Sequence, residues 1–281
     1  MERTIKQQVQ GVPAVDGAGV KLVRVLGHNS VDAYDPFLML DSFDSTNPSD
    51  YTAGFPMHPH RGIETVSFLS SGAMTHRDSL GNEDTVTDGE VQWMTAGSGI
   101  MHEEKLPAWP RMLGLQLWLN MPKEHKMAKP NYHAIKKADI EEIPLEGGKL
   151  RLLAGTYEGH TGHQGAYQPL DYYDIHLDAG ASVTLNVPKD NSAFVFTLLG
   201  DALVAGTPVR EKTAALTTQG DTLHIQAKDT PIEILFISSK RLDEPVAWGG
   251  PIVMNTEQEL RHAFTELRTG TFLKDSVDYD E

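Results

Sequence analysis

Four side chains in the first half of the chain have the types and the spacing of a metal site. His58 and His60 flank Pro59, and His102 and Glu104 are likewise two residues apart. Side chains two residues apart on an extended strand point to the same side, so each pair would present two ligands to one face. Three imidazoles and one carboxylate suit a divalent transition metal and leave exchangeable positions if the ion is octahedral.

The segments around both pairs favour strands that approach another backbone closely. Pro59 favours an extended backbone and donates no hydrogen bond, which places it near the start or the edge of a strand. A flexible Gly97-Ser98-Gly99 turn comes shortly before His102. If the two strands are neighbours in a barrel, the two pairs converge on one point. The pattern therefore predicts a single bound metal ion rather than isolated histidines.

Glu64 competes with Glu104 for a place among the ligands. It lies four residues after His60, an even spacing that could turn both side chains toward the same interior. Four protein ligands already leave room for a substrate, and a fifth would leave less. We expect Glu64 beside the ligands or in a structural pair, but its spacing leaves open whether it replaces or supplements Glu104.

Further side chains could line the same cavity. His76 is one of them, although an ordinary polar strand residue explains it more simply. Glu103 should point away from its two neighbours. The remaining candidates include aromatic and Met residues, which in strands usually belong to a core. They are Trp93, Met94, Gln116 and Trp118.

Short apolar, β-branched or aromatic runs separated by Gly-rich or polar turns fill most of the chain, as expected of strands. In the first half these runs are Lys21–Leu26, Pro36–Leu40, Thr65–Leu69, Val91–Met94 and Leu113–Leu119. In the second half they are Tyr173–Leu177, Ser182–Val187, Phe194–Leu199, Thr222–Ile225 and Ile232–Ile237. Many short strands at this spacing predict an all-β fold of the sandwich or barrel type.

A weak internal repeat indicates that the barrel is duplicated. The segment 66–72 resembles 195–200, and 89–96 resembles 220–227, in the same order. Between the halves, residues 121–139 are rich in Pro, Lys and His, as expected of a connection. We therefore expect an N-terminal metal-binding domain at residues 1–130 and a C-terminal domain at residues 131–281.

The C-terminal domain is expected to lack metal ligands. When the repeat is shifted onto the second half, the four ligand positions fall near Asn186 and Pro188 and on Glu233 and Leu235. These residues do not reproduce the three histidines and one glutamate of the first half.

One helix is expected near the end of the chain. Thr256 and Glu259 form a capping-box pattern, and Gly270 supplies a stop. The apolar face of this short helix, which should pack on a barrel, consists of Leu260, Ala263, Phe264 and Leu267. The acidic tail from Asp275 to Glu281 is expected to be mobile.

Composition limits the classes of function. The 281 residues include no cysteine, so neither disulfides nor thiolate ligands contribute, and a reducing, cytoplasmic location fits best. The formal net charge of −15 disfavours direct binding to nucleic acid. No signal-peptide pattern and no apolar run of membrane-spanning length is visible, so no membrane association is expected. We take a monomer as the default.

Several motifs together resemble the pirin family, a branch of the cupin superfamily. The resemblance rests on residues 58–66, 92–102, 114–118 and 250–256, which span nearly the whole chain. It implies two cupin barrels (double-stranded β-helix or jelly-roll) packed together, with metal only in the N-terminal one. It also implies that the ligands are His58, His60, His102 and Glu104, and it suggests iron, Fe(II), as the metal, with other divalent metals left open.

The resemblance implies two different functions. Several bacterial members resemble quercetin dioxygenases, which open a flavonol ring with O2 and release carbon monoxide. In such an enzyme Glu104 could accept the proton of the substrate hydroxyl as a general base. The alternative is a non-catalytic iron- or redox-sensing protein that binds a transcription regulator or another protein partner. A fold alone cannot choose between the two functions, and we favour the dioxygenase.

Overall fold

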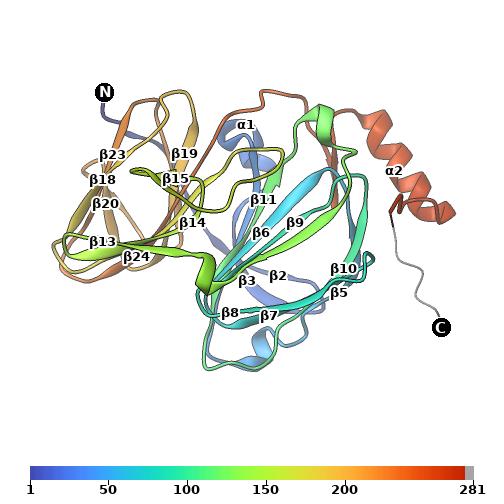
Figure 1. Cartoon of the computed structure of the whole chain (residues 1–281), viewed down its shortest axis with the longest axis horizontal. Helices are drawn as coiled ribbons and strands as arrows, with labels where there is room; N and C mark the ends of the chain where they lie inside the picture. Colours follow the sequence, from blue (N-terminus) through green and yellow to red (C-terminus); the bar gives the residue numbers. More distant parts are fainter. Residues whose placement is uncertain (276–281) are drawn as a thin grey trace. The chain divides into compact units, whose positions relative to one another are not determined.

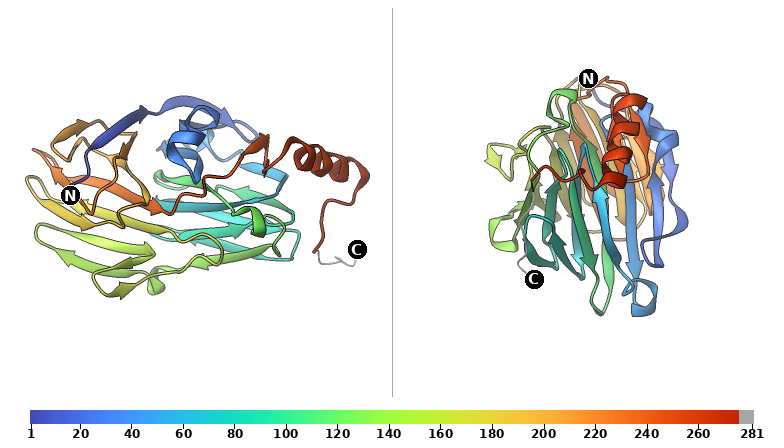
Figure 2. Two further views of the ribbon diagram at one scale, coloured as in Figure 1. Left: turned by 90° about the horizontal axis from the view of Figure 1, so that it is seen from above. Right: turned by 90° about the vertical axis from the view of Figure 1, so that its right-hand side faces the viewer.

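β-Strands form nearly all of the regular structure in the computed structural model, which describes residues 1–275 (Figures 1 and 2). This confirms the all-β prediction. The chain divides into two units that are both discontinuous in sequence. The histidine unit contains Pro13–Leu22, Phe37–Lys136 and Asp243 onward, and the second unit contains Met1–Val12, Val23–Pro36 and Lys137–Leu242. This division differs from a single cut after residue 130.

The histidine unit is built from two sheets. The larger has the strand order β12-β9-β6-β11-β4-β3-β2 and the smaller the order β5-β10-β7-β8. Its strands are β2 (Val12–Asp16), β3 (Val20–Leu26), β4 (Phe37–Ser45), β5 (Phe55–His60), β6 (Ile63–Ser71), β7 (Ala73–Asp78), β8 (Glu83–Thr87), β9 (Val91–Thr95), β10 (Ile100–Lys105), β11 (Met112–Asn120) and β12 (Asn131–Ile135). Part of its core consists of apolar side chains from both sheets, among them Phe43 and Leu69 from the larger and Met74 and Val86 from the smaller.

The second unit has the same plan. Its larger sheet has the order β1-β22-β19-β24-β17-β14-β13, and its smaller sheet the order β18-β23-β20-β21. Its strands are β1 (Ile5–Gln10), β13 (Glu141–Leu145), β14 (Gly148–Ala154), β17 (Asp171–Leu177), β18 (Ser182–Asn186), β19 (Ser192–Leu199), β20 (Ala202–Val204), β21 (Thr207–Val209), β22 (Thr213–Thr217), β23 (Thr222–Ala227) and β24 (Ile232–Ser239). A short hairpin, β15 (Thr156–Tyr157) and β16 (His160–Thr161), adds to it.

The two strand orders correspond position by position, as a duplicated barrel requires. β6 occupies the place of β19, which agrees with the predicted match between residues 66–72 and 195–200. The second predicted match was wrong: β9 corresponds to β22, whereas β23 corresponds to β10. Short Val- and Leu-rich strands resemble one another whatever their place in a sheet, so sequence similarity paired the wrong two.

This correspondence shows what fills the ligand positions in the second unit. In the histidine unit, β5 and β10 carry the two candidate ligand pairs. Their counterparts β18 and β23 direct apolar side chains into the core instead, namely Val183, Leu185, Leu223 and Ile225. The absence of a metal from the C-terminal barrel stays a prediction, but the interior positions that could hold one in the same way are apolar.

The C-terminal segment belongs to the histidine unit. Helix α2 (Glu257–Thr269, red in Figures 1 and 2) begins at the N-cap Thr256, has the predicted capping box with Glu259 and ends at Gly270, whose φ is 72°. Its apolar face packs with the hairpin of β25 (Ala247–Gly249) and β26 (Ile252–Met254) and with Phe272. The predicted helix and its apolar face are thus confirmed. The expectation for the acidic tail concerns residues 276–281, which lie outside the described residues.

The remaining elements are short. The predicted connection at residues 121–139 contains β12, which pairs with β9 and so belongs to the barrel. Helix α1 (Val31–Tyr34) and the 3₁₀ turns η1 (His28–Ser30), η2 (Pro48–Asp50), η3 (Lys123–His125) and η4 (Lys137–Asp139) complete the structure. Among the described residues, no helix has the length and apolar character needed to cross a membrane.

Candidate metal centre

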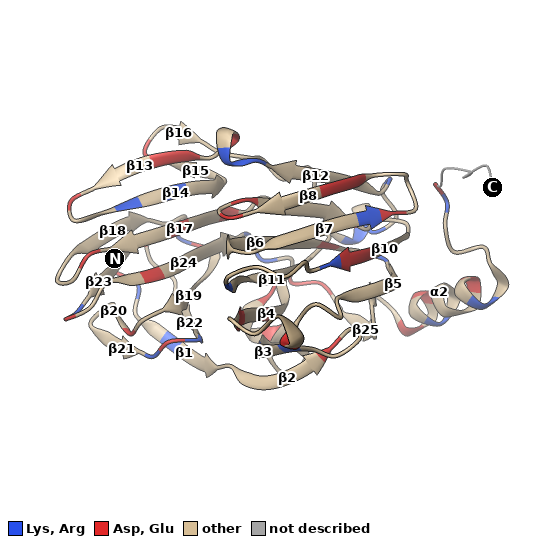
Figure 3. Ribbon diagram, turned by 90° about the horizontal axis from the view of Figure 1, so that it is seen from below, with Lys and Arg blue, Asp and Glu red and all other residues tan. Residues whose placement is uncertain are grey.

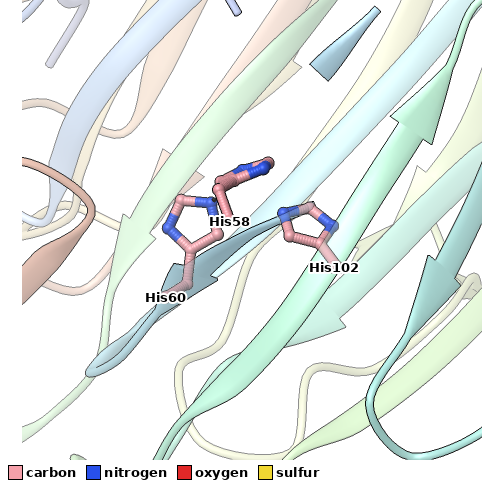
Figure 4. Close-up of side chains that lie close together, drawn as sticks. All are labelled: His58, His60 and His102. Atoms are coloured by element: carbon pink, nitrogen blue, oxygen red, sulfur yellow. Dashed lines mark hydrogen bonds between the residues drawn. The ribbon is translucent and has the colours of Figure 1, made fainter. Parts of the chain in front are cut away.

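Strands β5 and β10 bring three histidines together. The strands pair antiparallel with His58 directly opposite His102, and His60 follows on the same face. The nearest ring nitrogens of the three all lie within 4.8 Å of one another, and the rings point toward a common space (Figure 4). His60 and His102 are buried, and His58 is half-buried at the edge. The sequence spacing therefore predicted this convergence correctly.

Two of the rings have a fixed tautomer. His58 Nδ1 lies 2.8 Å from the carbonyl oxygen of Pro56, and His60 Nδ1 lies 3.0 Å from that of Pro251. A carbonyl oxygen only accepts hydrogen bonds, so each Nδ1 must carry the proton and each Nε2 of a neutral ring carries a lone pair. These two Nε2 atoms are 3.0 Å apart. Two lone pairs facing each other at this distance form no hydrogen bond, but both can bind one cation.

The third ring, that of His102, also offers its Nε2 to a metal. His102 Nε2 is buried without a hydrogen-bond partner among the described residues. Burial, followed by the charges of His60 and His58, holds the pKa of His102 well below its usual value, and burial and His58 lower the pKa of His60 to about 3. These two rings are therefore neutral at pH 7, as metal ligands must be.

The spacing of the nitrogens also fits a metal. Metal–nitrogen bonds of about 2.1 Å that meet at right angles place their nitrogens about 3.0 Å apart. This agrees with the distance between the Nε2 atoms of His58 and His60. The donor set, the buried Nε2 of His102 and this spacing all suit a divalent transition metal.

Glu104 is buried on the same face but lies outside the three-histidine group. Its Oε1 accepts a hydrogen bond from Gln92 Nε2, and both of its carboxylate oxygens accept from Gln116 Nε2 at 3.0 and 3.1 Å. Gln116 also donates to Ser67 Oγ at 3.1 Å. Two amides thus hold the carboxylate beside the histidines, and the role of Glu104 as a ligand stays a prediction.

Glu64 lies on the opposite face of its sheet. It precedes Thr65, which pairs with Trp118 on the site side, and its Oε1 accepts a hydrogen bond from Thr95 Oγ1 at 2.6 Å. The even spacing from His60 was misleading because Gly62, with φ of 76°, separates two strands of different sheets and resets the alternation. Burial raises the pKa of Glu64. Its place is in a structural pair.

His76 lies against the histidine group, contrary to the simpler interpretation of it as an ordinary strand residue. It is fully buried, its Nε2 lies 2.8 Å from Asp78 Oδ2, and its Nδ1 lies 3.3 Å from His102 Nδ1. The ring of Tyr132 stacks on it with centroids 4.1 Å apart. The sequence analysis missed Asp78, Gln92 and Tyr132. The alternation of residues 74, 76 and 78 on one strand was the signal that could have indicated Asp78.

The tryptophans that the sequence suggested as lining residues lie on opposite faces of the larger sheet. Trp118 lies edge-on to His60, with ring centroids 5.0 Å apart, and its other neighbour is Trp248 at 5.8 Å. Trp93 hydrogen-bonds Glu64 and thus belongs to the opposite face. Trp118 and Gln116 therefore line the site, and Trp93 does not.

Two buried basic side chains fasten the turn after His60 to the C-terminal segment. Arg61 donates to the carbonyl oxygens of Ser98 (2.6 Å) and Phe272 (2.7 Å) and pairs with Glu266, while its guanidinium lies 4.2 Å from the centre of the Phe272 ring. Lys126 Nζ donates to Gly62 O (2.8 Å), Asn120 Oδ1 (2.6 Å) and Val253 O (3.0 Å). These bonds hold Pro251 and its neighbours where they meet the site.

The second unit contains another group with the composition of a metal site. One ligand atom each from Asp174, His176 and Glu233 lies within 4.8 Å of the others. Asp174 Oδ2, however, accepts from Arg151 Nη1 (3.1 Å) and bonds His176 Nε2 (3.0 Å). Burial lowers the pKa of His176, but the bond to Asp174 and the charges of Asp174 and Glu233 more than offset this and raise it. This is the arrangement of an ion-pair network.

Two jelly-roll barrels of matching strand order, one with converging imidazoles, define a two-domain cupin with a candidate metal centre. The family models described as Pirin and as Pirin C-terminal cupin domain match residues 19–119 and 172–273. The chain belongs to the pirin family.

Known relatives agree over nearly the whole length. A Pseudomonas aeruginosa protein, provisionally named a quercetin 2,3-dioxygenase, is 39% identical and covers 95% of this chain and 97% of its own. The crystal structure of quercetin 2,3-dioxygenase from Acinetobacter baumannii has a TM-score of 0.90 at 32% identity, covering 97% and 99%. A bacterial pirin from Escherichia coli in complex with nickel(II) has a TM-score of 0.64 at 20% identity, covering 84% and 98%, and shares the fold.

Proposed function

We propose that this protein is a metal-dependent dioxygenase of the quercetinase type, which opens a flavonol ring with O2 and uses iron as its metal. The observation that carries the proposal is the convergence of three imidazoles whose Nε2 atoms are free for a metal, beside a buried carboxylate. The similarity to a quercetin 2,3-dioxygenase over 97% of the chain supports the substrate class. The substrate and O2 are the small-molecule partners that the proposal requires.

The residues of the chain have separate tasks in this proposal. His58, His60 and His102 hold the metal, and Glu104 either joins them or stays beside them. A divalent metal held there would act as a Lewis acid and would lower the pKa of the substrate hydroxyl. Glu104 accepts the hydroxyl proton of the flavonol as a general base.

The surroundings of Glu104 suit this task. Gln92 and Gln116 donate to its carboxylate and keep it in one orientation, so that little reorganisation is needed when the substrate arrives. Trp118, which is 8% exposed, offers an aromatic surface beside His60 on which a flat flavonol ring could lie.

The test is oxygen uptake with quercetin by protein loaded anaerobically with Fe(II), with His58→Ala as the control. Stoichiometric release of carbon monoxide by the wild type alone would support the proposal. No uptake by protein that retains one iron per chain would contradict it and would favour a non-catalytic role. Parallel loading with Ni(II), Mn(II), Co(II) and Cu(II), followed by metal analysis, identifies the metal that gives the highest turnover.

A further inference from the structure

The three candidate ligands differ in what holds their Nδ1 atoms. For His58 and His60 the partner is a backbone carbonyl oxygen, which always accepts. For His102 the partner is the Nδ1 of His76, 3.3 Å away. An imidazole nitrogen can donate or accept, so the tautomer of His102 depends on where the proton of His76 lies.

Asp78 decides where that proton lies. Its Oδ1 accepts from the backbone N–H groups of Leu80 (2.8 Å) and Asn82 (3.1 Å), and its Oδ2 lies 2.8 Å from His76 Nε2. Asn82 Nδ2 donates to both carboxylate oxygens as well, at 3.2 Å to Oδ1 and 2.9 Å to Oδ2. The carboxylate is therefore ionised and can only accept, so His76 Nε2 carries a proton.

The positions of the protons on His76 and His102 follow from this. A neutral His76 with its proton on Nε2 has a lone pair on Nδ1. That lone pair accepts the Nδ1–H of His102, and the Nε2 of His102 is then free of a proton. This nitrogen is the buried atom without a hydrogen-bond partner among the described residues. We propose that Asp78 and His76 form a positioning pair that fixes the tautomer of His102 and presents its Nε2 to the metal.

The backbone keeps the pair in place. Strands β7 and β10 pair with Asp78 opposite His102 and His76 opposite Glu104, so all four side chains share one face. Tyr132 stacks on the His76 ring with an interplanar angle of 12°, which restrains the rotation of that ring. The inference rests on the metal centre of the proposed function but not on the dioxygenase reaction.

The sharpest variant is Asp78→Asn. The amide oxygen must stay where Oδ1 is, because the N–H groups of Leu80 and Asn82 point there. The NH2 group then takes the place of Oδ2, so the Asn82 amide, which donates to Oδ2 in the wild type, must turn its oxygen toward it. The NH2 group also donates to His76 Nε2, which moves the His76 proton to Nδ1 and the His102 proton to Nε2. Replacing the acid by its amide produces the wrong histidine tautomer in the same way in the Ser-His-Asp triad.

Two measurements on the protein alone test the pair. Two-bond ¹H–¹⁵N spectra of the metal-free protein report the tautomer of each ring, and competition with a chromophoric chelator gives the affinity for Co(II). We expect the Nδ1–H tautomer of His102 in the wild type and the Nε2–H tautomer in Asp78→Asn. We also expect the affinity of Asp78→Asn to fall by about 10- to 100-fold. Asn82→Ala, which removes the two side-chain bonds to Asp78 but keeps the backbone N–H and the charge of Asp78, should change the affinity less than about threefold.

A second pair of variants is independent of Asp78. His76→Asn places an amide oxygen near the position of Nδ1, where it can accept from His102, whereas His76→Leu has a similar size and no acceptor. We expect His76→Asn to retain most of the affinity and His76→Leu to lose about 10- to 100-fold. Equal affinities of these two variants, or an Nε2–H tautomer of His102 in the wild type, would overturn the inference. Because no substrate or O2 is used, failure of the dioxygenase proposal leaves both readouts intact.

Discussion

His60 Nδ1 donates to the carbonyl oxygen of Pro251, at 3.0 Å and 191 positions further along the chain. A candidate ligand near the N-terminus is thus oriented by a backbone group that arrives with the C-terminal segment. Arg61 and Lys126 hold that segment in place through buried hydrogen bonds. The stability of the segment and the geometry of the site are therefore linked.

Replacing Arg61 tests this link. Arg61→Met would remove the donor that Arg61 supplies to the carbonyl oxygens of Ser98 and Phe272 and would leave Glu266 with Lys274 alone as its close cationic partner. Breaking a buried ion pair by removing one partner costs about 3–5 kcal/mol, and the partial exposure of Glu266 favours the lower end. We expect a loss of this size in urea unfolding. Arg261→Met, at an exposed helix pair with Glu257, should stay within about 0.5 kcal/mol of the wild type. Similar values for the two variants would contradict the role of Arg61.

Gly62 offers a second test of the contact between the turn after His60 and the C-terminal segment. A Cβ at this position would lie 2.0 Å from the carbonyl oxygen of Val253, and φ is 76°. Gly62→Ala should therefore destabilise the protein by more than about 2 kcal/mol, through backbone strain and a clash. Gly250→Ala is the matched control, because φ is 53° but no atom lies within 4 Å of the added Cβ. If thermal or urea unfolding gave the same loss for both, the clash would play no part.

Replacing Glu104, with its neighbour Glu103 as the control, separates the loss of a general base from the loss of a surface charge. Glu104→Gln keeps the size of the side chain but removes the general base, so we expect kcat with quercetin to fall by about 100-fold or more. Glu103 points outward and pairs with Lys105 (3.3 Å) and Arg77 (3.9 Å). Figure 3 shows acidic and basic segments on β10 and a basic segment on β7. Glu103→Gln should leave kcat within about twofold. Metal analysis of Glu104→Gln shows in addition whether the carboxylate is needed to retain the ion.

The pH dependence of stability should reveal the network in the second unit. The pKa of His176 is raised in the folded protein, so its charged form is favoured there over the unfolded chain, where the value is about 6.5. Its contribution is therefore complete below about pH 6.5 and is lost as the pH rises through the folded value. The difference in unfolding free energy between the wild type and His176→Gln should be larger at pH 6 than at pH 9. A difference that grew with pH would show the opposite sign of the shift.

The sequence predicted the helix and the strands better than it predicted which residues lie opposite one another on neighbouring strands. Helix α2 could be located because caps and periodicity are local, and the three histidines because a two-residue spacing survives in any regular strand. The spacing of Glu64 left its face open because a single positive φ at Gly62 resets the alternation, and spacing alone does not show where a strand ends. Asp78 and Gln92 were missed because cross-strand neighbours depend on register, which one sequence does not encode locally.

The discontinuous units have a consequence for synthesis. Residues 243–273 contribute Pro251, Val253 and helix α2 to the histidine unit, and they are synthesised long after the strands that carry the histidines. A nascent chain can form β5 and β10 early, but His60 then lacks its carbonyl partner and Arg61 lacks Glu266. At a synthesis rate of about 5–20 residues per second, β5 and β10 are complete well before residues 243–273 are made. Metal loading should therefore be a late event that follows the synthesis of this segment.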